Sequence, residues 1–440
     1  MLTYHLRLAM KSLRRNPVVA GLMIGAIALG VGVCITTLTV YRLMSGNPIA
    51  HRNDVLYAVT VDSWDPKEAF DEDDRTDLPP PELTYRDAMA LFQSDIPDRK
   101  VLMRKGAFVL DPVQTQGAHP FLVEARLTTG DFFAMFDTPF LYGGGWDKSA
   151  DETSQMVVVL SKETNETAFG GADSVGRTLR LDGRDFKVIG VLDQWTPTPK
   201  FYDLNNGAFN EVEEIYAPFS VGTQLEVQSS GNVNCWKIQT LNSFQDFLNG
   251  ECVWIQSWVE LGDRDKVEAY QNFVDNYVRE QKTLGRFERP LNNRLTRPDQ
   301  WLEDNEAVRD DNRVLVGLSF MFLAVCLLNM IGLLLAKFLG AAPIVGLRRA
   351  LGASKGMIFR QHLVEVGVIG FAGGALGIGI AALGLAGMRK VYENFESLTQ
   401  LDVPMGLAAL AIAVVSGVIA GLYPTWRVCR LQPAAHLKTQ

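Results

Sequence analysis

The uneven distribution of charge constrains the fold of this chain more than any other feature of its sequence. No Asp or Glu precedes Asp54, and an apolar run extends over residues 18–40. A second apolar, acid-poor block begins near Val314 and continues to the end of the chain. Residues 45–312 hold 46 of the 50 acidic residues but only 26 of the 42 basic ones. The sequence therefore predicts two membrane-embedded ends around one large acidic soluble domain.

Four apolar segments are long enough to cross a hydrocarbon core about 30 Å thick, which takes about 20 helical residues. They cover residues 18–44, 314–337, 363–388 and 404–426. The first segment ends in a sequence that makes a poor signal-peptidase site, so we expect an uncleaved anchor. The predicted membrane domain is therefore α-helical with four spans, and the soluble domain is inserted between the first and second.

The short segments outside the spans predict the orientation, because short basic loops stay in the cytoplasm. Segments 1–17, 338–362 and 427–440 contain basic residues and no acid, whereas segment 389–403 has no positive bias. Both termini and the 338–362 loop are therefore predicted to be cytoplasmic, and residues 45–313 to lie outside. Apolar and basic residues alternate in 1–17, which suits a short amphipathic helix on the anionic leaflet.

The soluble segment 45–299 has the pattern of an α+β domain. Residues 156–160 predict a buried strand, residues 178–189 a hairpin, and Asp263–Gly285 an amphipathic helix. Residues 300–313 are charged and compatible with a helix, so they can continue the second span as a rigid stalk.

Small residues recur at a spacing of four in the spans, which lets membrane helices approach closely. Packing within one chain and a dimer interface explain this spacing equally well. No ionisable residue lies mid-span, so the spans do not resemble an ion path. Glu365 and His362 lie near a cytoplasmic end, where we expect them to reach water. The glycine pairs with this spacing are Gly21 and Gly25, Gly370 and Gly374, and Gly373 and Gly377.

Cys235 and Cys252 are the cysteines of the soluble segment. If that segment faces an oxidising space, they can form a disulfide that closes a loop of roughly 17 residues. Two unpaired thiols are the alternative.

No pattern in the chain predicts catalysis. Gly171–Thr178 fits a phosphate-binding loop except that Arg177 replaces the lysine, and it leads into a hairpin rather than a helix. There is no His-Glu-x-x-His motif and no paired His/Cys spacing typical of a metal site. We therefore expect a non-catalytic chain with no cofactor, no metal and no nucleic-acid partner.

Several motifs resemble one family. Pro343–Ser354, followed by Ile358, Gln361 and Glu365, is similar to the loop and third span of MacB/FtsX-type ABC transporter permeases. Ala9–Asn16 resembles the start of such permeases. The soluble domain has motifs similar to the MacB-type periplasmic core domain, and the chain end is similar to the family's end. These motifs are Gly130–Phe133, Val159–Ser161, Phe169–Gly171, Val175–Leu179, Val188–Val191 and Gly421–Leu437. The resemblance is weak over 55–105 and 195–260.

This resemblance implies a dimeric permease of the bacterial inner membrane that binds a cytoplasmic ABC ATPase through the 338–362 loop. ATP would be bound and hydrolysed by that separate subunit, and the motion passed to the periplasmic domains to export a peptide, lipid-linked or small hydrophobic substrate. In the MacB subgroup a periplasmic adaptor and an outer-membrane channel complete an efflux pump. The residues expected to contact the ATPase are Gly346, Leu347, Arg348, Arg349, Ala350, Leu351 and Gly352. The alternative is that Arg348 and Arg349 only anchor the loop to anionic lipid.

One position departs from the family pattern. Many members have an acidic residue where this chain has Ile344, preceded by Pro343. We hypothesise a heterodimer whose other permease keeps the acid, with a homodimer and ordinary drift as the alternative. An FtsX-like transmitter that controls a periplasmic hydrolase, and a permease that extracts lipoproteins, are the other functions that this architecture allows.

Overall fold

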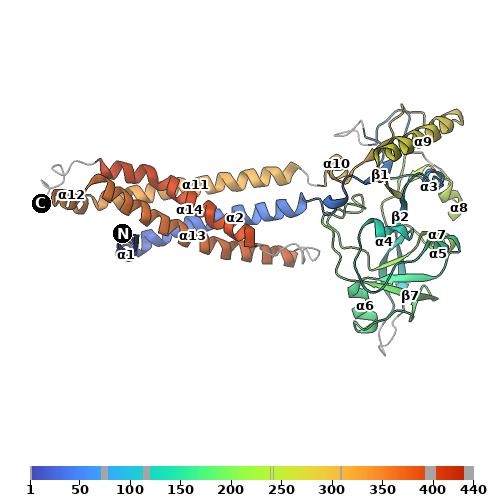
Figure 1. The fold of residues 1–440 in the computed structure, drawn as a ribbon, viewed down its shortest axis with the longest axis horizontal. Helices are drawn as coiled ribbons and strands as arrows, with labels where there is room; N and C mark the ends of the chain where they lie inside the picture. Colours follow the sequence, from blue (N-terminus) through green and yellow to red (C-terminus); the bar gives the residue numbers. More distant parts are fainter. Residues whose placement is uncertain are drawn as a thin grey trace. The chain divides into compact units, whose positions relative to one another are not determined.

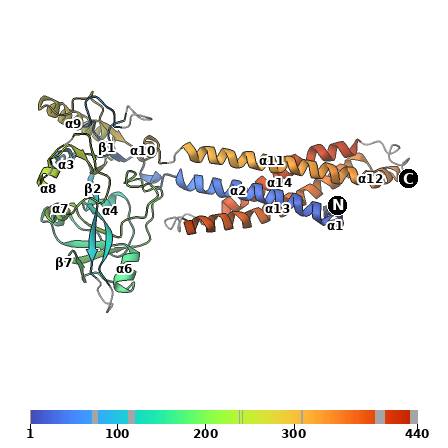
Figure 2. The same cartoon turned by 180° about the vertical axis from the view of Figure 1, so that it is seen from behind.

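The computed structural model describes residues 2–70, 78–111, 119–237, 239–240, 242–307, 310–391 and 403–430. It divides into two compact units, which Figures 1 and 2 show from opposite sides. The membrane unit comprises Met1–Ser45 and Val308–Gln440, and the sheet domain comprises Gly46–Ala307. Most of the predicted outer loop 389–403 and of the predicted tail 427–440 lies outside the described residues.

All the regular secondary structure in the described part of the membrane unit is helical. Four of its helices are long and apolar enough to cross a membrane, at Pro17–Met44, Asn312–Gly340, Lys355–Met388 and Pro404–Cys429. The prediction of four spans, with a soluble domain between the first and second, is confirmed. The helices are α1 (Leu2–Arg15), α2 (Pro17–Met44), α11 (Asp310–Gly340), α12 (Ala342–Ala350), α13 (Lys355–Val391) and α14 (Val403–Cys429).

The spans of the membrane unit lie side by side as a bundle (Figures 1 and 2). Helix α2 packs against α11, α13 and α14, and α13 also packs against α1 and α14. Pro17 opens α2, where its missing N–H removes no helical hydrogen bond. Helices α1 and α12 lie at the same end of the bundle (Figure 1). The basic segments 1–17 and 338–362 are thereby gathered at one end of the spans.

The sheet domain is built on a mixed ten-stranded sheet in the order β12-β1-β11-β2-β3-β8-β5-β7-β4, with β6 paired to β2 and β7. The pairs β3–β8 and β5–β7 are parallel, and the other pairs are antiparallel. The strands are β1 (Leu56–Thr60), β2 (Arg99–Leu110), β3 (Phe121–Thr128), β4 (Phe140–Gly143), β5 (Val157–Leu160), β6 (Thr178–Leu181), β7 (Arg184–Leu192), β8 (Ile215–Pro218), β11 (Gln256–Glu260) and β12 (Arg294–Thr296). A separate small sheet pairs β9 (Asn234–Cys235) with β10 (Cys252–Val253).

The sheet has a buried hydrophobic cluster on each face. Side chains alternate along a strand, so successive residues of one strand enter different clusters. On β2, Val101 and Met103 face one buried cluster, and Leu102 faces another that includes residues of α3 and α9. The helices of the domain are η1 (Ala50–Arg52), α3 (Tyr85–Phe92), α4 (Asp131–Met135), α5 (Lys148–Glu152), α6 (Lys162–Phe169), α7 (Phe219–Gln224), α8 (Phe244–Leu248), α9 (Arg264–Thr283) and α10 (Pro298–Asp304).

The structure contains the predicted strand, hairpin and helix of this domain. All four residues of β5 are buried. Strands β6 and β7 are antiparallel, and both Asp182 and Gly183 have positive φ, as a tight two-residue hairpin turn requires. In α9 the Asp263 side chain accepts a hydrogen bond from the N–H of Lys266, which caps the helix.

The predicted stalk over 300–313 is not one continuous helix. Helix α10 ends at Asp304 and α11 begins at Asp310. Glu306 has a φ of +46°, and the N–H of Ala307 donates to the Leu302 carbonyl at 2.9 Å. A residue with positive φ followed by this hydrogen bond terminates a helix, so α10 ends here and does not continue into the span.

Candidate functional site

Helix α12 is a separate short helix that joins α11 to α13. Pro343 lies in its first turn, where backbone N–H groups have no partner within the helix. Gly352 follows its end with a φ of +98°, a conformation that favours glycine. The N–H of Met357 donates to Ser354 Oγ at 3.2 Å and caps the first turn of α13. Local sequence therefore sets both ends of α12 and turns the chain into the next span.

With one exception, the predicted ATPase-contact residues form an exposed apolar and basic surface on α12 and the turn that follows it, which we call the α12 surface. The side chains of Leu347 and Leu351 are 54% and 79% exposed. Arg348, Ala350 and Gly352 are exposed, Arg349 is half-buried, and Gly346 is buried. Gly346 thus lies on the buried face of α12 rather than on the predicted contact surface. Exposed leucines flanked by arginines favour a protein partner over water.

A hydrogen bond links this surface to the third span. Arg348 on α12 donates from Nη1 to Gln361 Oε1 on α13 at 2.9 Å. Gln361 was part of the motif that carried the family resemblance, but the sequence did not indicate this partner. A displacement of α12 would therefore act on α13 directly.

Glu365 and His362, which were predicted to reach water, are buried instead. Glu365 is 1% exposed and His362 6%. Lys337 on α11 donates to Glu365 Oε1, and Ser12 on α1 donates to the same oxygen at 2.6 Å. The Nδ1 atom of His362 lies 3.5 Å from Glu365 Oε2. The prediction failed because α1 and α11 cover this part of α13, and no local pattern shows that contact.

The four predicted packing glycines of α13 contact other helices of the same chain. A Cβ atom added at Gly373 would lie 2.7 Å from Ile27 Cβ on α2, and one at Gly377 would lie 3.2 Å from a carbonyl oxygen of α2. Added Cβ atoms at Gly370 and Gly374 would meet α14, at 3.0 Å from the Ala413 carbonyl oxygen and 2.8 Å from the Ala413 Cβ. Helix α13 thus uses glycine on two faces to approach both neighbours closely.

Gly21 and Gly25 behave differently from the glycines of α13. A Cβ atom added at either position would meet nothing within 4 Å among the described residues. Their spacing therefore serves no contact inside the described membrane unit.

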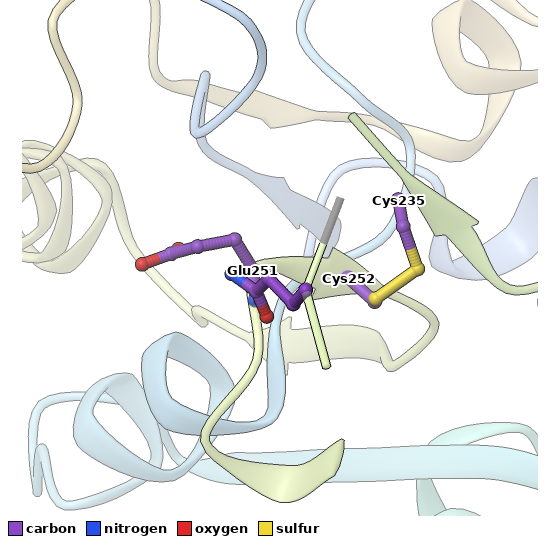
Figure 3. The surroundings of a disulfide bond; sticks show 4 residues. Cys235, Glu251 and Cys252 are labelled. Carbon is purple, nitrogen blue, oxygen red and sulfur yellow. A yellow bond between two sulfur atoms is a disulfide. The ribbon is translucent and has the colours of Figure 1, made fainter. Parts of the chain in front are cut away.

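In the sheet domain, Cys235 and Cys252 are joined by a disulfide across the β9–β10 pair (Figure 3). Glu251, which precedes Cys252, accepts a hydrogen bond from Arg286 Nη2 at 3.0 Å. Arg286 also donates to Asp87 at 2.8 Å. The disulfide strand is therefore tied to the start of α3 through a half-buried arginine.

A buried charge cluster, which the sequence did not indicate, lies at the middle of the sheet. Arg126 on β3 is fully buried and pairs with Asp203 and Glu213. Lys200 pairs with Glu213 at 3.1 Å. Burial lowers the pKa of Arg126, but the charges of Asp203 and Glu213 raise it above the ordinary value. Two cations thus balance two carboxylates inside the domain.

A third carboxyl group, that of Glu82, lies beside this cluster without a cation of its own in it. It is 1% exposed, and its Oε1 accepts a hydrogen bond from Gln256 Nε2 at 2.5 Å. Burial, followed by the negative charge of Asp203, raises the pKa of Glu82 to about 8. Burial therefore favours the protonated form of Glu82 at neutral pH.

The comparisons with known proteins match both units. Residues 20–276 match the MacB-like periplasmic core domain, and residues 316–433 match the FtsX-like permease C-terminal domain. The first match alone covers more than half of the chain. The chain belongs to the MacB-like family of ABC transporter permeases. The resemblance predicted from the sequence is thereby confirmed.

This permease is similar to full-length transporters of several bacteria. It is 25% identical to the macrolide export ATP-binding/permease protein MacB of Syntrophobacter fumaroxidans over 71% of this chain and 46% of that protein. It is 23% identical to the pyoverdine export ATP-binding/permease protein PvdT of Pseudomonas aeruginosa over 70% of this chain and 41% of that protein. The permease thus spans less than half of the length of these relatives.

A solved structure is also similar to part of the permease. The periplasmic region of MacB from Actinobacillus actinomycetemcomitans aligns with a TM-score of 0.36 and 12% identity, over 59% of this chain and 97% of that one.

Proposed function

We propose that this permease is the membrane subunit of an ABC exporter and that a separate cytoplasmic ATPase binds its α12 surface. The names of the MacB and PvdT relatives describe export and combine an ATP-binding part with a permease part. The family matches on this chain are a periplasmic core domain and a permease domain. In this proposal the ATPase supplies ATP binding and hydrolysis, and the permease is not itself catalytic.

Two exposed leucines of the α12 surface carry the proposal. Leu347 lies on α12 and Leu351 directly follows it, and both lie between the second and third membrane helices. Apolar side chains this exposed, on a helix that also presents arginines, suit the groove of a partner protein. The arginines can reach carboxylates at the rim of such a groove.

The proposed orientation places both termini and α12 in the cytoplasm, and the sheet domain in the periplasm of a bacterial inner membrane. The positive-inside rule supports it, because the acid-free basic segments all lie on one side. The Cys235–Cys252 disulfide supports it independently, because disulfides persist in oxidising compartments.

In the proposed mechanism, closure of the ATPases displaces α12, and the contacts described above distribute the movement. Arg348 couples α12 to α13 through Gln361, and Lys337 couples α11 to α13 through Glu365. The movement would reach the sheet domain through α2 and α11, the helices on either side of it in the chain. Dimerisation, as homodimer or heterodimer, together with an adaptor and an outer-membrane channel, belongs to the same proposal.

Co-purification from native cells tests ATPase binding. We expect Leu347→Asp/Leu351→Asp to lose an ABC ATPase that the wild-type permease retains in mild detergent. Met10→Asp is the control, because Met10 is an exposed apolar residue of α1 at the same end of the bundle but outside the 338–362 loop. If the double variant inserts normally and retains the ATPase as fully as the control, α12 is not the docking site. Recovery of a periplasmic hydrolase as the other partner would instead support the transmitter alternative.

A further inference from the structure

A cavity of about 740 Å³ opens between α1, α11, α12, α13 and the start of α2 in the membrane unit. Its size is that of a small-molecule site. The cavity is lined at the start of the first span by Val19, at the end of the second by Leu333 and Lys337, and at the start of the third by Ile358 and Gln361. These positions are the same end of three spans, so the cavity lies at the level where lipid headgroups meet the hydrocarbon core.

The polar wall of this cavity carries an excess of positive charge. Lys11, Arg15, Lys337 and Arg348 line it, against the single carboxylate of Glu365. Glu365 is already paired with Lys337. Lys11 and Arg15 have no acidic partner among the described residues, and Arg348 donates to a neutral amide. Three cationic groups therefore face the cavity without a counter-charge from the described chain.

A buried histidine and several apolar side chains complete the lining of the cavity. His362 lines the cavity and is 6% exposed, and its Nδ1 lies 3.5 Å from Glu365 Oε2. Apolar side chains also line the cavity and form what we call its apolar wall: Leu8, Val19, Leu333 and Ile344. A ligand that fits both walls has an anionic head and an apolar body.

We propose that this cavity binds the phosphodiester headgroup of an anionic membrane phospholipid, with an acyl chain along the apolar wall. Lys and Arg side chains bind phosphate strongly, and a membrane interface concentrates anionic lipid beside them. A free phosphate shares the headgroup chemistry but leaves the apolar wall in contact with water. The bound lipid would tie α1 to α12, so it would brace the helix that carries the docking surface.

Native mass spectrometry of the purified full-length permease tests this site, with phosphatidylglycerol and phosphatidylcholine as probes. We expect phosphatidylglycerol to bind at least about tenfold more tightly than phosphatidylcholine, and Lys11→Gln/Arg15→Gln to remove most of that preference. The control is Lys355→Gln/Arg360→Gln, which removes two exposed cations at the same end of the bundle but outside the cavity. Equal loss in the control would overturn the proposal, because it would mean diffuse surface attraction.

A second pair of variants keeps the test independent of α1. Ile344 lines the cavity, so Ile344→Glu adds a negative charge there while Ile344→Gln adds a polar group of equal size. We expect the glutamate to weaken phosphatidylglycerol binding and the glutamine to leave it nearly unchanged. Displacement of the lipid by millimolar inorganic phosphate would indicate a free-phosphate site. If Ile344→Glu left lipid binding unchanged but lost a co-purified ATPase, the cavity would be a protein-docking site. Either result would contradict the lipid proposal.

Discussion

Lys337 on α11 and Glu365 on α13 form an ion pair inside the membrane unit, and their side chains are only 4% and 1% exposed. Ser12 Oγ on α1 completes the surroundings of the carboxylate at 2.6 Å. Three helices that are far apart in the sequence thus meet at one buried charge pair.

Breaking this pair on one side should destabilise the permease far more than removing it entirely. Lys337→Met or Glu365→Met alone leaves a buried charge without its partner, which costs about 3–5 kcal/mol. The double variant Lys337→Met/Glu365→Met leaves neither charge, so we expect its loss to be smaller than that of either single variant. Thermal unfolding of the three variants in detergent measures this. A double variant whose loss equals the sum of the single losses would show that the two residues do not interact.

The sheet domain should become less stable as the pH rises from 5 to 8. Because Glu82 has a raised pKa of about 8, the folded state holds a proton that the unfolded state has already lost. Stability therefore falls over this range, by on the order of 4 kcal/mol from this group. In Glu82→Gln that dependence should disappear. Urea unfolding followed by tryptophan fluorescence at both pH values measures the difference, and parallel curves for wild type and variant would refute the assignment.

Those two predictions rest on contacts that the sequence did not show, whereas the spans themselves were predictable. A run of more than 20 apolar residues usually forms a transmembrane helix, so the four spans could be predicted from composition alone. The β6–β7 hairpin follows from alternation on either side of Asp182-Gly183, because its turn is local.

Long-range pairing was not predictable in this way. The neighbours of β1 are β11 and β12, about 200 residues later in the chain, and β-alternation does not name a partner. Likewise, the sequence shows Glu365 near a span end but not that Ser12 and Lys337 cover it. For α12, charge and small residues located the surface, but only the packing shows that Gly346 is buried.

We expect the packing glycines of α13 not to tolerate a side chain, whereas Gly21 of α2 should tolerate one. In Gly373→Leu the added Cβ would lie 2.7 Å from that of Ile27, so α2 and α13 must separate. Overpacking of this kind costs about 1–3 kcal/mol or more. Gly21→Leu is the matched control, because nothing lies within 4 Å of its added Cβ. The measurement is the melting temperature of Gly373→Leu and of Gly21→Leu in detergent. Equal melting temperatures would mean that the α2–α13 contact is looser than described.

Loss of the disulfide should loosen the β9–β10 region. The bond closes a loop with a sequence separation of 17, so its removal costs about 3 kcal/mol in the entropic view. In Cys235→Ser/Cys252→Ser we expect faster amide hydrogen exchange at Val253 and in the neighbouring strand. Wild type under reducing conditions should match the variant. Unchanged exchange in both would show that the strand pairing holds the region without the bond.

The most direct test of the account is photo-crosslinking from the α12 surface in native membranes. A photoreactive residue at position 351, where the native leucine is 79% exposed, should form a conjugate that contains an ABC ATPase. The same residue at position 284 of the sheet domain, where the native leucine is 69% exposed, should not, because we place that domain on the opposite side of the membrane. An ATPase conjugate from position 284, or none from 351 while a known ABC complex crosslinks in the same cells, would contradict the account.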